Sequence, residues 1–222
     1  MKKLAFLITI VAILFQSCTS EKTRSEEKAV ADEPSQPVPK KSETEVKEFL
    51  KESGVLIEVN GKEVYREDNL KDVSYQDLIE SLKSLEANNS GNNLAIFYLK
   101  VAGAAREDQS ERARFIKDYV SSDEEFYKPM DKMVKFLQRQ ERPMIKAALL
   151  NITEEISNDQ CLEYLQYSGY ISGTAASSFS YNDKVLKTYP MFFKIALLDK
   201  LRNAEGKAGM VYEQMAASLG VS

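Results

Sequence analysis

The chain has 222 residues, with 30 basic side chains against 34 acidic ones and a formal net charge of −4. This acidic balance, without a cluster of lysine and arginine among aromatic residues, argues against nucleic acid as a partner. The sequence contains no histidine, which excludes histidine general bases, Ser-His and Cys-His pairs, and the commonest ligands of zinc and copper. It also contains no nucleotide-binding loop or cofactor motif, so we expect no cofactor.

The N-terminal segment has the pattern of an export signal. A basic start, Met1–Lys3, precedes an apolar run, Leu4–Phe15, that is too short to span a bilayer. The run leads into Phe15-Gln16-Ser17-Cys18, which resembles the lipobox of bacterial lipoprotein precursors, although that family prefers an aliphatic and a small residue at the first two positions. The alternative is an ordinary secretory signal in which Cys18 has no role.

The lipobox resemblance implies how the chain is processed and where in the cell it lies. It implies that residues 1–17 are removed as a signal peptide and that Cys18 carries fatty acyl chains such as palmitate. The mature protein would then lie in the bacterial cell envelope, anchored to a membrane and facing its extracytoplasmic side. Loss of the two lysines of the signal leaves 28 basic residues (30 less two) against 34 acidic ones, a formal charge of −6.

Residues 18–42 are predicted to be the lipidated cysteine and a disordered tether. After Cys18 the segment is rich in Glu, Lys, Ser, Thr and Ala, contains three of the six prolines, and lacks an apolar period. Such a composition does not bury enough apolar surface to offset the entropy lost on ordering. Its typical reach is about 25–30 Å. We interpret the segment as a spacer; the alternative is a proline-rich ligand for a partner domain.

Residues 43–222 are long enough for a single domain with a substantial core. Asn60-Gly61 lies between two β-prone runs, Val55–Val59 and Lys62–Tyr65, which predicts a hairpin near 55–65 with a type I′ turn. This stretch, followed by an acidic helix, resembles the start of parvulin-type periplasmic chaperones, which implies an accessory role in the envelope. Nothing that resembles their isomerase domain follows.

The rest of the domain is predicted to be helical from its apolar periodicity and helix-capping residues. The predicted helical segments are Glu43–Glu52, the stretch capped by Ser74 and reaching Leu85, Leu94–Ala105 with its continuation Ser110–Val120, the stretch opened by Pro129 after a cap at Ser122, Met144–Leu150 after a break at Pro143, the stretch capped by Ser157 with Gln160, Lys187–Asn203 beginning near Pro190, and Lys207–Leu219. We therefore expect a mainly α fold: one domain of about seven or eight helices with a small N-terminal β-hairpin.

The helix Leu94–Ala105 is apolar on nearly all sides, which predicts a central buried position. The small residues Gly103–Ala105 at its end would let a neighbouring element approach closely. Cys161 is the one cysteine left if Cys18 is lipidated, so no intramolecular disulfide is expected. We interpret Cys161 as a core residue, stapled to Ile156, because a nucleophilic thiol would need a base and no histidine exists.

Three tyrosines are the candidate partner-binding residues. At 100° per residue, Tyr164 falls at the edge of the face that carries Cys161, and Tyr167 points well away from it. Together with Tyr170 these side chains could form a binding surface, since tyrosine combines a large apolar area with a polar tip. The alternative is that the tyrosines only cover the edge of the core.

Two acidic runs, Asp123–Glu125 and Glu154–Glu155, could serve acid/base chemistry or bind a hard cation. Each follows Ser or Thr, so we expect both to lie at helix starts, where negative charge favours the helix dipole. The hypothesis we prefer for the whole chain is a non-catalytic, lipid-anchored envelope protein that acts as a protein-binding or chaperone-like accessory module. The alternatives are a carrier of a small apolar ligand and an enzyme that works through carboxylates.

Overall fold

The computed structural model describes residues 41–222 apart from 67, 89, 121–125, 176–177 and 222. They belong to the second, Val38–Ser222, of the two units into which the chain divides. The signal-like segment, Cys18 and the tether up to residue 40 therefore lie outside the described residues, as do the predicted cap at Ser122 and the acidic run Asp123–Glu125. None of the helices in the described part of the chain combines the length and apolarity needed to cross a membrane.

The described residues form ten α-helices and two small two-stranded sheets, which confirms the mainly helical prediction and exceeds the expected number of helices. The elements are α1 (Glu43–Glu52), β1 (Leu56–Val59), β2 (Lys62–Tyr65), η1 (Asp68–Asp72), α2 (Tyr75–Ala87), α3 (Asn93–Ala104), α4 (Gln109–Phe115), η2 (Ile116–Val120), α5 (Tyr127–Leu137), α6 (Pro143–Glu155), α7 (Asn158–Tyr167), β3 (Ile171–Ser172), β4 (Ser180–Tyr181), α8 (Asp183–Thr188), α9 (Met191–Leu201) and α10 (Gly206–Leu219). The hairpin β1–β2 follows α1, which corrects the expectation of an N-terminal hairpin.

The hairpin has the predicted turn. Asn60 and Gly61 both have positive φ, 53° and 74°, as a type I′ turn requires. A two-stranded sheet is barely stable alone, and this one packs on α3. Tyr65 stacks on Tyr98 with ring centroids 5.0 Å apart, and its hydroxyl donates a hydrogen bond to Asn92 Oδ1 at 3.4 Å. The turn signal and the aromatic contact together fix where the hairpin lies.

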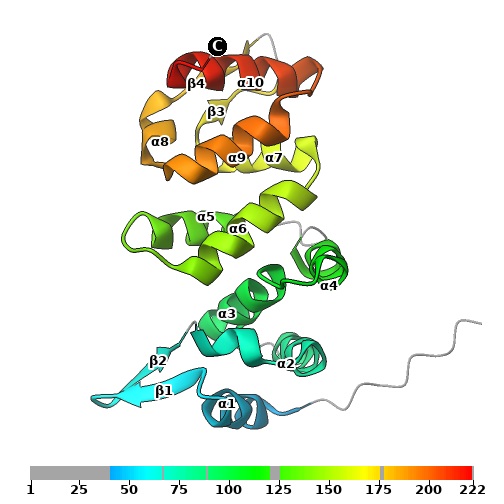
Figure 1. The fold of residues 1–222 in the computed structure, drawn as a ribbon, viewed down its shortest axis with the longest axis vertical. Coiled ribbons are helices and arrows are strands. Elements are labelled where there is room, and N and C mark those ends of the chain that lie inside the picture. The colour runs from blue at the N-terminus through cyan, green and yellow to red at the C-terminus, as the bar shows by residue number, and fades with distance from the viewer. Residues whose placement is uncertain (1–40, 67, 89, 121–125, 176–177, 222) are drawn as a thin grey trace, which may run out of the picture. The chain divides into compact units, whose positions relative to one another are not determined.

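Helix α3 is the central helix that its composition predicted. Nine of its twelve residues are buried, and it contacts α2 on one side and α6 on the other (Figure 1). At its C-terminal end the ring of Phe115 from α4 lies directly against Gly103. The close approach expected at Gly103–Ala105 is therefore confirmed, and its partner is an aromatic ring.

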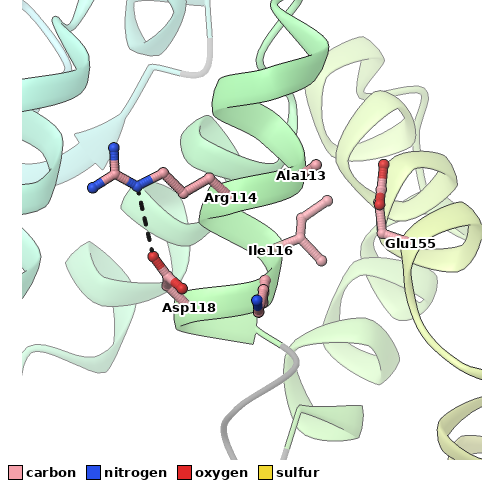
Figure 2. Close-up of a pocket in the computed structure, with 6 residues that line it drawn as sticks. Ala113, Arg114, Ile116, Asp118 and Glu155 are labelled. Carbon is pink, nitrogen blue, oxygen red and sulfur yellow. Dashed lines mark ion pairs between the residues drawn. The ribbon is translucent and has the colours of Figure 1, made fainter. Parts of the chain in front are cut away.

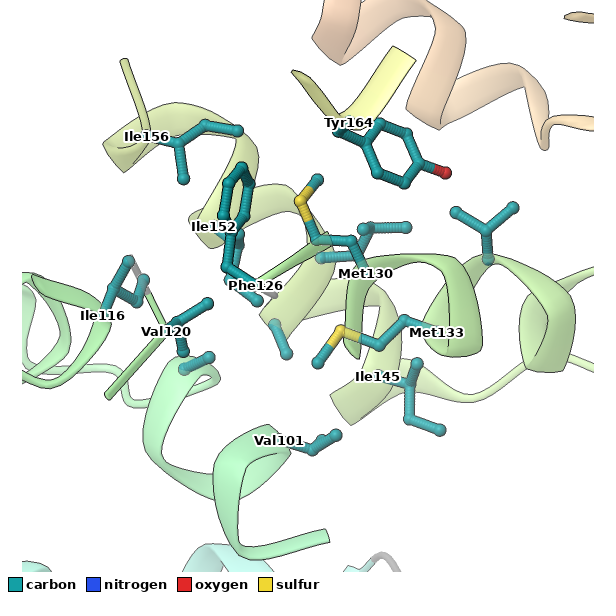
Figure 3. Packing of buried hydrophobic residues seen from close by; sticks show 14 of the residues in the cluster. Val101, Ile116, Val120, Phe126, Met130, Met133, Ile145, Ile152, Ile156 and Tyr164 are labelled. Carbon is teal, nitrogen blue, oxygen red and sulfur yellow. The ribbon is translucent and has the colours of Figure 1, made fainter. Parts of the chain in front are cut away.

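The hydrophobic core is continuous along the domain. Contacts run from α1 to α2, α3, α6, α9 and α10 in turn, and α5 packs against both α6 and α7. Figure 3 shows how the α5 methionines fill the space between these helices: Met133 lies near Ile145 of α6, and Met130 lies near Tyr164 of α7. This core positions α7, which carries two of the three candidate tyrosines.

The helix predicted within Lys187–Asn203 to begin near Pro190 is α9, and a short helix that was not predicted, α8, precedes it. Pro190 has no N–H to donate and disfavours the helical conformation of the preceding residue. Tyr189 accordingly has extended backbone angles, φ −71° and ψ 138°, and separates α8 from α9. The short strands β3 and β4 were also not predicted, because two residues each are too few to show an alternating pattern.

Candidate functional site

Helix α7 begins at an N-terminal capping box. Ser157 Oγ accepts a hydrogen bond from the Gln160 N–H at 3.1 Å, and the Ser157 N–H donates to Gln160 Oε1 at 2.9 Å. This capping box, which the sequence predicted, fixes the start of the helix. The helical period then turns Cys161 and Leu165 into the core, both 0% exposed.

Tyr164 lies in the core and not on the surface. It is 0% exposed, and its ring packs edge-on against Phe193 of α9 at 5.8 Å and beside Tyr189 at 6.2 Å. Burial raises the pKa of Tyr164 well above its usual value, and burial raises the pKa of Tyr189 to about 12. Tyr164 therefore adds no exposed area to a partner surface, because its position at the edge of the face that carries Cys161 turns it into the core.

Tyr170 is buried as well. Its side chain is 0% exposed and its ring lies 5.9 Å from that of Tyr181, while its carbonyl accepts a hydrogen bond from the Asn182 N–H at 2.8 Å. Burial also raises the pKa of Tyr170. The residue holds the β3–β4 hairpin against the core and offers no surface to a partner. The expected three-tyrosine surface does not form.

Tyr167 is exposed, as its helical position predicted. It keeps 45% of its surface accessible, and its ring lies 4.3 Å from that of Tyr127 on α5. Beside it on α5, Lys135 Nζ pairs with Asp131 Oδ2 at 2.6 Å. The Asp131 carboxylate, with a smaller contribution from Tyr167, raises the pKa of Lys135. We call Tyr127 and Tyr167 the tyrosine pair; it is an aromatic surface with polar tips and charged neighbours.

Tyr127 was missed because the sequence placed the start of its helix at Pro129. The helix begins two residues earlier, at Tyr127. Proline is tolerated there because the first N–H groups of a helix have no partner within it. Helix periodicity carries no signal for the packing of α5 on α7, so only the fold brings Tyr127 to Tyr167.

The carboxylates Glu154 and Glu155 do not form an acid/base pair. They lie in the last turn of α6 rather than at a helix start, which corrects the expectation from sequence. Thr153 does not cap a new helix; its hydroxyl donates back to the Leu149 carbonyl at 2.7 Å. Lys200 Nζ donates to the Glu154 carbonyl at 2.8 Å and so satisfies an otherwise free acceptor at the helix end.

Three clefts can be described. Glu155 lines one of about 500 Å³ with Ile116, near the Arg114–Asp118 ion pair at 3.9 Å (Figure 2). Glu154 lines a different one, of about 440 Å³ between α6 and α9. The largest of the three, about 730 Å³, is lined by apolar residues and by side chains of both charges. Its lining residues are Lys71, Asp72, Ala102, Ala105, Arg106, Glu107, Asp108, Glu111, Pro143, Met144 and Ala147.

One acidic residue of the largest cleft, Asp108, has a structural role. Asp108 Oδ1 accepts a hydrogen bond from the Glu111 N–H at 2.8 Å and so caps α4. Within the described ranges, no three Cys, Asp or Glu side chains converge as metal ligands would. Burial raises the pKa of Cys161 to about 12, which keeps this thiol protonated at neutral pH, in agreement with the core position predicted for it.

Tyr167 is therefore the candidate residue that both sequence and fold place at the surface, and the fold adds Tyr127 beside it. Comparison with known proteins adds no family to this description: no protein-family model, no curated protein and no solved structure matches the chain.

Proposed function

We propose that this protein is a lipid-anchored, extracytoplasmic protein of a bacterial cell envelope that binds another envelope protein and acts as a binding module rather than as an enzyme. The observation that carries the binding role is the tyrosine pair, with Tyr167 45% exposed and its ring in contact with that of Tyr127 at 4.3 Å. Tyrosine is enriched among the residues that dominate protein interfaces. A ring already held by its neighbour also loses less conformational entropy when a partner packs on it.

The proposed cellular location rests on the segment Met1–Cys18. We expect Cys18→Ala to give an unlipidated product that fractionates with soluble proteins. The physical reason is that acyl chains at Cys18 would supply the membrane affinity. Membrane fractionation with mass spectrometry of the intact protein measures this. Cys161→Ala is the matched control and should stay with the membrane. A Cys18→Ala protein that still sediments with membranes would refute the lipid anchor.

The partner surface is tested by photocrosslinking in living cells, with a photoreactive residue in place of Tyr167. We expect one dominant protein adduct, identified by mass spectrometry, because residue 167 would lie inside the interface. The matched control is Glu213, which is exposed on α10. The absence of an adduct from a folded, well-expressed product, or an equal adduct from position 213, would contradict the proposed surface.

The two alternative functions gain no support from the described clefts. A carrier of a small apolar ligand needs a predominantly apolar pocket, whereas each of the three clefts carries charged side chains on its walls. A carboxylate enzyme needs two acids that face one substrate, whereas Glu154 and Glu155 line separate clefts. The tyrosine pair therefore supports binding of a protein over both.

A further inference from the structure

Helix α1 is attached to the domain by few apolar contacts. Of its ten residues, Val46 and Leu50 are buried and Phe49 packs partly buried against the core, whereas nine of the twelve residues of α3 are buried. Segments with little buried apolar surface open locally more easily than the core does. The position of α1 therefore depends strongly on polar contacts at its two ends.

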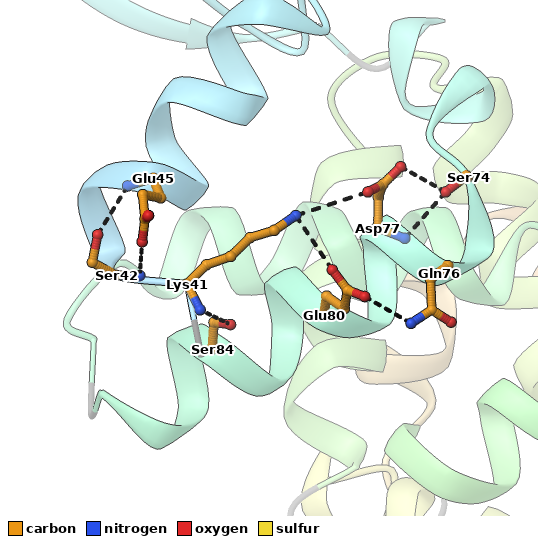
Figure 4. A network of polar contacts seen from close by, with 8 residues as sticks. All are labelled: Lys41, Ser42, Glu45, Ser74, Gln76, Asp77, Glu80 and Ser84. Atoms are coloured by element: carbon orange, nitrogen blue, oxygen red, sulfur yellow. Dashed lines mark hydrogen bonds and ion pairs between the residues drawn. The ribbon is translucent and has the colours of Figure 1, made fainter. Parts of the chain in front are cut away.

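The N-terminal contacts converge on Lys41 (Figure 4). Its N–H donates to Ser84 Oγ at 3.1 Å, and its carbonyl accepts from Asn88 Nδ2 at 3.1 Å. Its Nζ pairs with Glu80 at 3.5 Å and with Asp77 at 3.8 Å. Because Ser84, Asn88, Glu80 and Asp77 all belong to α2 or its C-cap, these contacts clamp the chain to α2 just before α1 begins. We call them the Lys41 clamp.

The other polar contacts of α1 are also near the surface. Lys47 Nζ lies 2.6 Å from Glu63 Oε1 of β2, and Lys51 Nζ lies 3.9 Å from the same atom. The side chains of Lys47 and Glu63 are each 42% exposed. Exposed ion pairs of this kind are weak and are screened by salt. They hold α1 in place without making it as stable as the core.

The chain is firmly fixed again immediately after α1. Gly54, with a positive φ of 68°, has its carbonyl bonded by Asn69 Nδ2 at 2.9 Å. The next carbonyl, that of Val55, accepts a hydrogen bond from the Arg66 N–H at 2.7 Å, and the Val55 side chain is 0% exposed. Any opening that begins at Lys41 would therefore stop at Gly54.

We propose that residues 41–53 form a strap that detaches from α2 and β1 as a unit while the rest of the domain stays folded. Opening would add up to about 45 Å of extended chain between the tether and the body. It would also uncover the faces of α2 and β1 that α1 contacts. Where the protein is anchored through Cys18, as proposed above, an open strap would lie between the anchored N-terminal segment and the rest of the domain.

Hydrogen exchange of the full chain, followed by mass spectrometry, tests the strap without relying on lipidation or on a partner. We expect peptides from α1 to exchange at least about tenfold faster than peptides from α3, because opening of the strap does not require global unfolding. A rise in salt from 0.1 M to 1 M shortens the screening length from about 10 Å to 3 Å. It should accelerate exchange in α1 and leave α3 unchanged.

The variant Lys41→Ala removes the two ion pairs of the clamp and should accelerate exchange in α1 alone. The matched control is Lys135→Ala, which removes the ion pair with Asp131 on α5 and should leave α1 unaffected. The strap is overturned if α1 exchanges as slowly as α3, if Lys41→Ala has no effect on α1, or if that variant accelerates all helices equally. The last result would show that the Lys41 clamp stabilises the whole domain.

Discussion

Substitution of Gly103 by alanine is expected to lower the free energy of unfolding by about 1–3 kcal/mol, the usual cost of overpacking a core. A Cβ at position 103 would lie 2.3–2.4 Å from three atoms of the Phe115 ring. Phe115 is itself 0% exposed, so its ring has no open space into which to move. Urea unfolding followed by circular dichroism measures the change as a lower midpoint at an unchanged slope.

Gly91→Ala is the matched control for Gly103→Ala. A Cβ at position 91 would meet nothing within 4 Å, so alanine should be neutral or stabilise by about 0.4–1 kcal/mol through the unfolded state. The double variant Gly103→Ala/Phe115→Leu should recover part of the loss, because the smaller side chain makes room for the new methyl group. If Gly103→Ala lowers the free energy of unfolding by no more than Gly91→Ala does, the result would contradict the close packing of α3 against α4.

The second large effect is expected at alkaline pH, where the domain should lose stability steeply above about pH 9. Burial raises the pKa of Cys161 from 9.0 to about 12. Between these values the unfolded chain has lost a proton that the folded chain retains, so the free energy of unfolding falls as pH rises. At about 1.4 kcal/mol per pH unit, Cys161 alone accounts for roughly 4 kcal/mol by pH 12. The raised pKa values of Tyr164 and Tyr189 act in the same direction above pH 10.

Thermal unfolding between pH 7 and pH 10.5 measures this dependence, and Cys161→Ala isolates the contribution of the thiol. That variant should be less stable at pH 7, because it leaves a cavity, but should lose less stability between pH 9 and pH 10. If stability falls equally steeply with pH in both proteins, the loss arises from other groups, and the buried thiol is not its cause. Below pH 8 position 161 should add nothing to the pH dependence of stability in either protein, because the thiol stays protonated in both the folded and the unfolded chain.

Much of the fold could be predicted where the signal is local. Asn60-Gly61 defines its own turn, and Ser157 with Gln160 defines the start of α7, so the structure confirms both. The same kind of reasoning was wrong at Glu154–Glu155, because Thr153 was interpreted as a cap but bonds back along its own helix. A hydroxyl before acidic residues fits both situations, and only the surrounding packing distinguishes them.

The candidate site could be predicted only in part. Helical period alone placed Tyr167 outward, and its observed exposure agrees. The burial of Tyr170 depends on the β3–β4 hairpin, and the contact of Tyr127 with Tyr167 depends on how α5 packs against α7. The burial of Tyr170 and the contact between the two tyrosines are both tertiary effects, so the local sequence around each residue does not predict them.

The succession of helix contacts from α1 to α10 also bears on how the domain folds. Many of the strongest contacts join elements close in sequence, such as β1 with β2, α2 with α3, and α5 with α6. Local contacts of this kind favour rapid folding because little loop entropy is lost before a contact forms. The segment from α2 to α3 can therefore collapse before α9 and α10 have been synthesised. Folding can then advance from the N-terminal helices to the C-terminal ones as the chain emerges, with each completed layer serving as the template for the next.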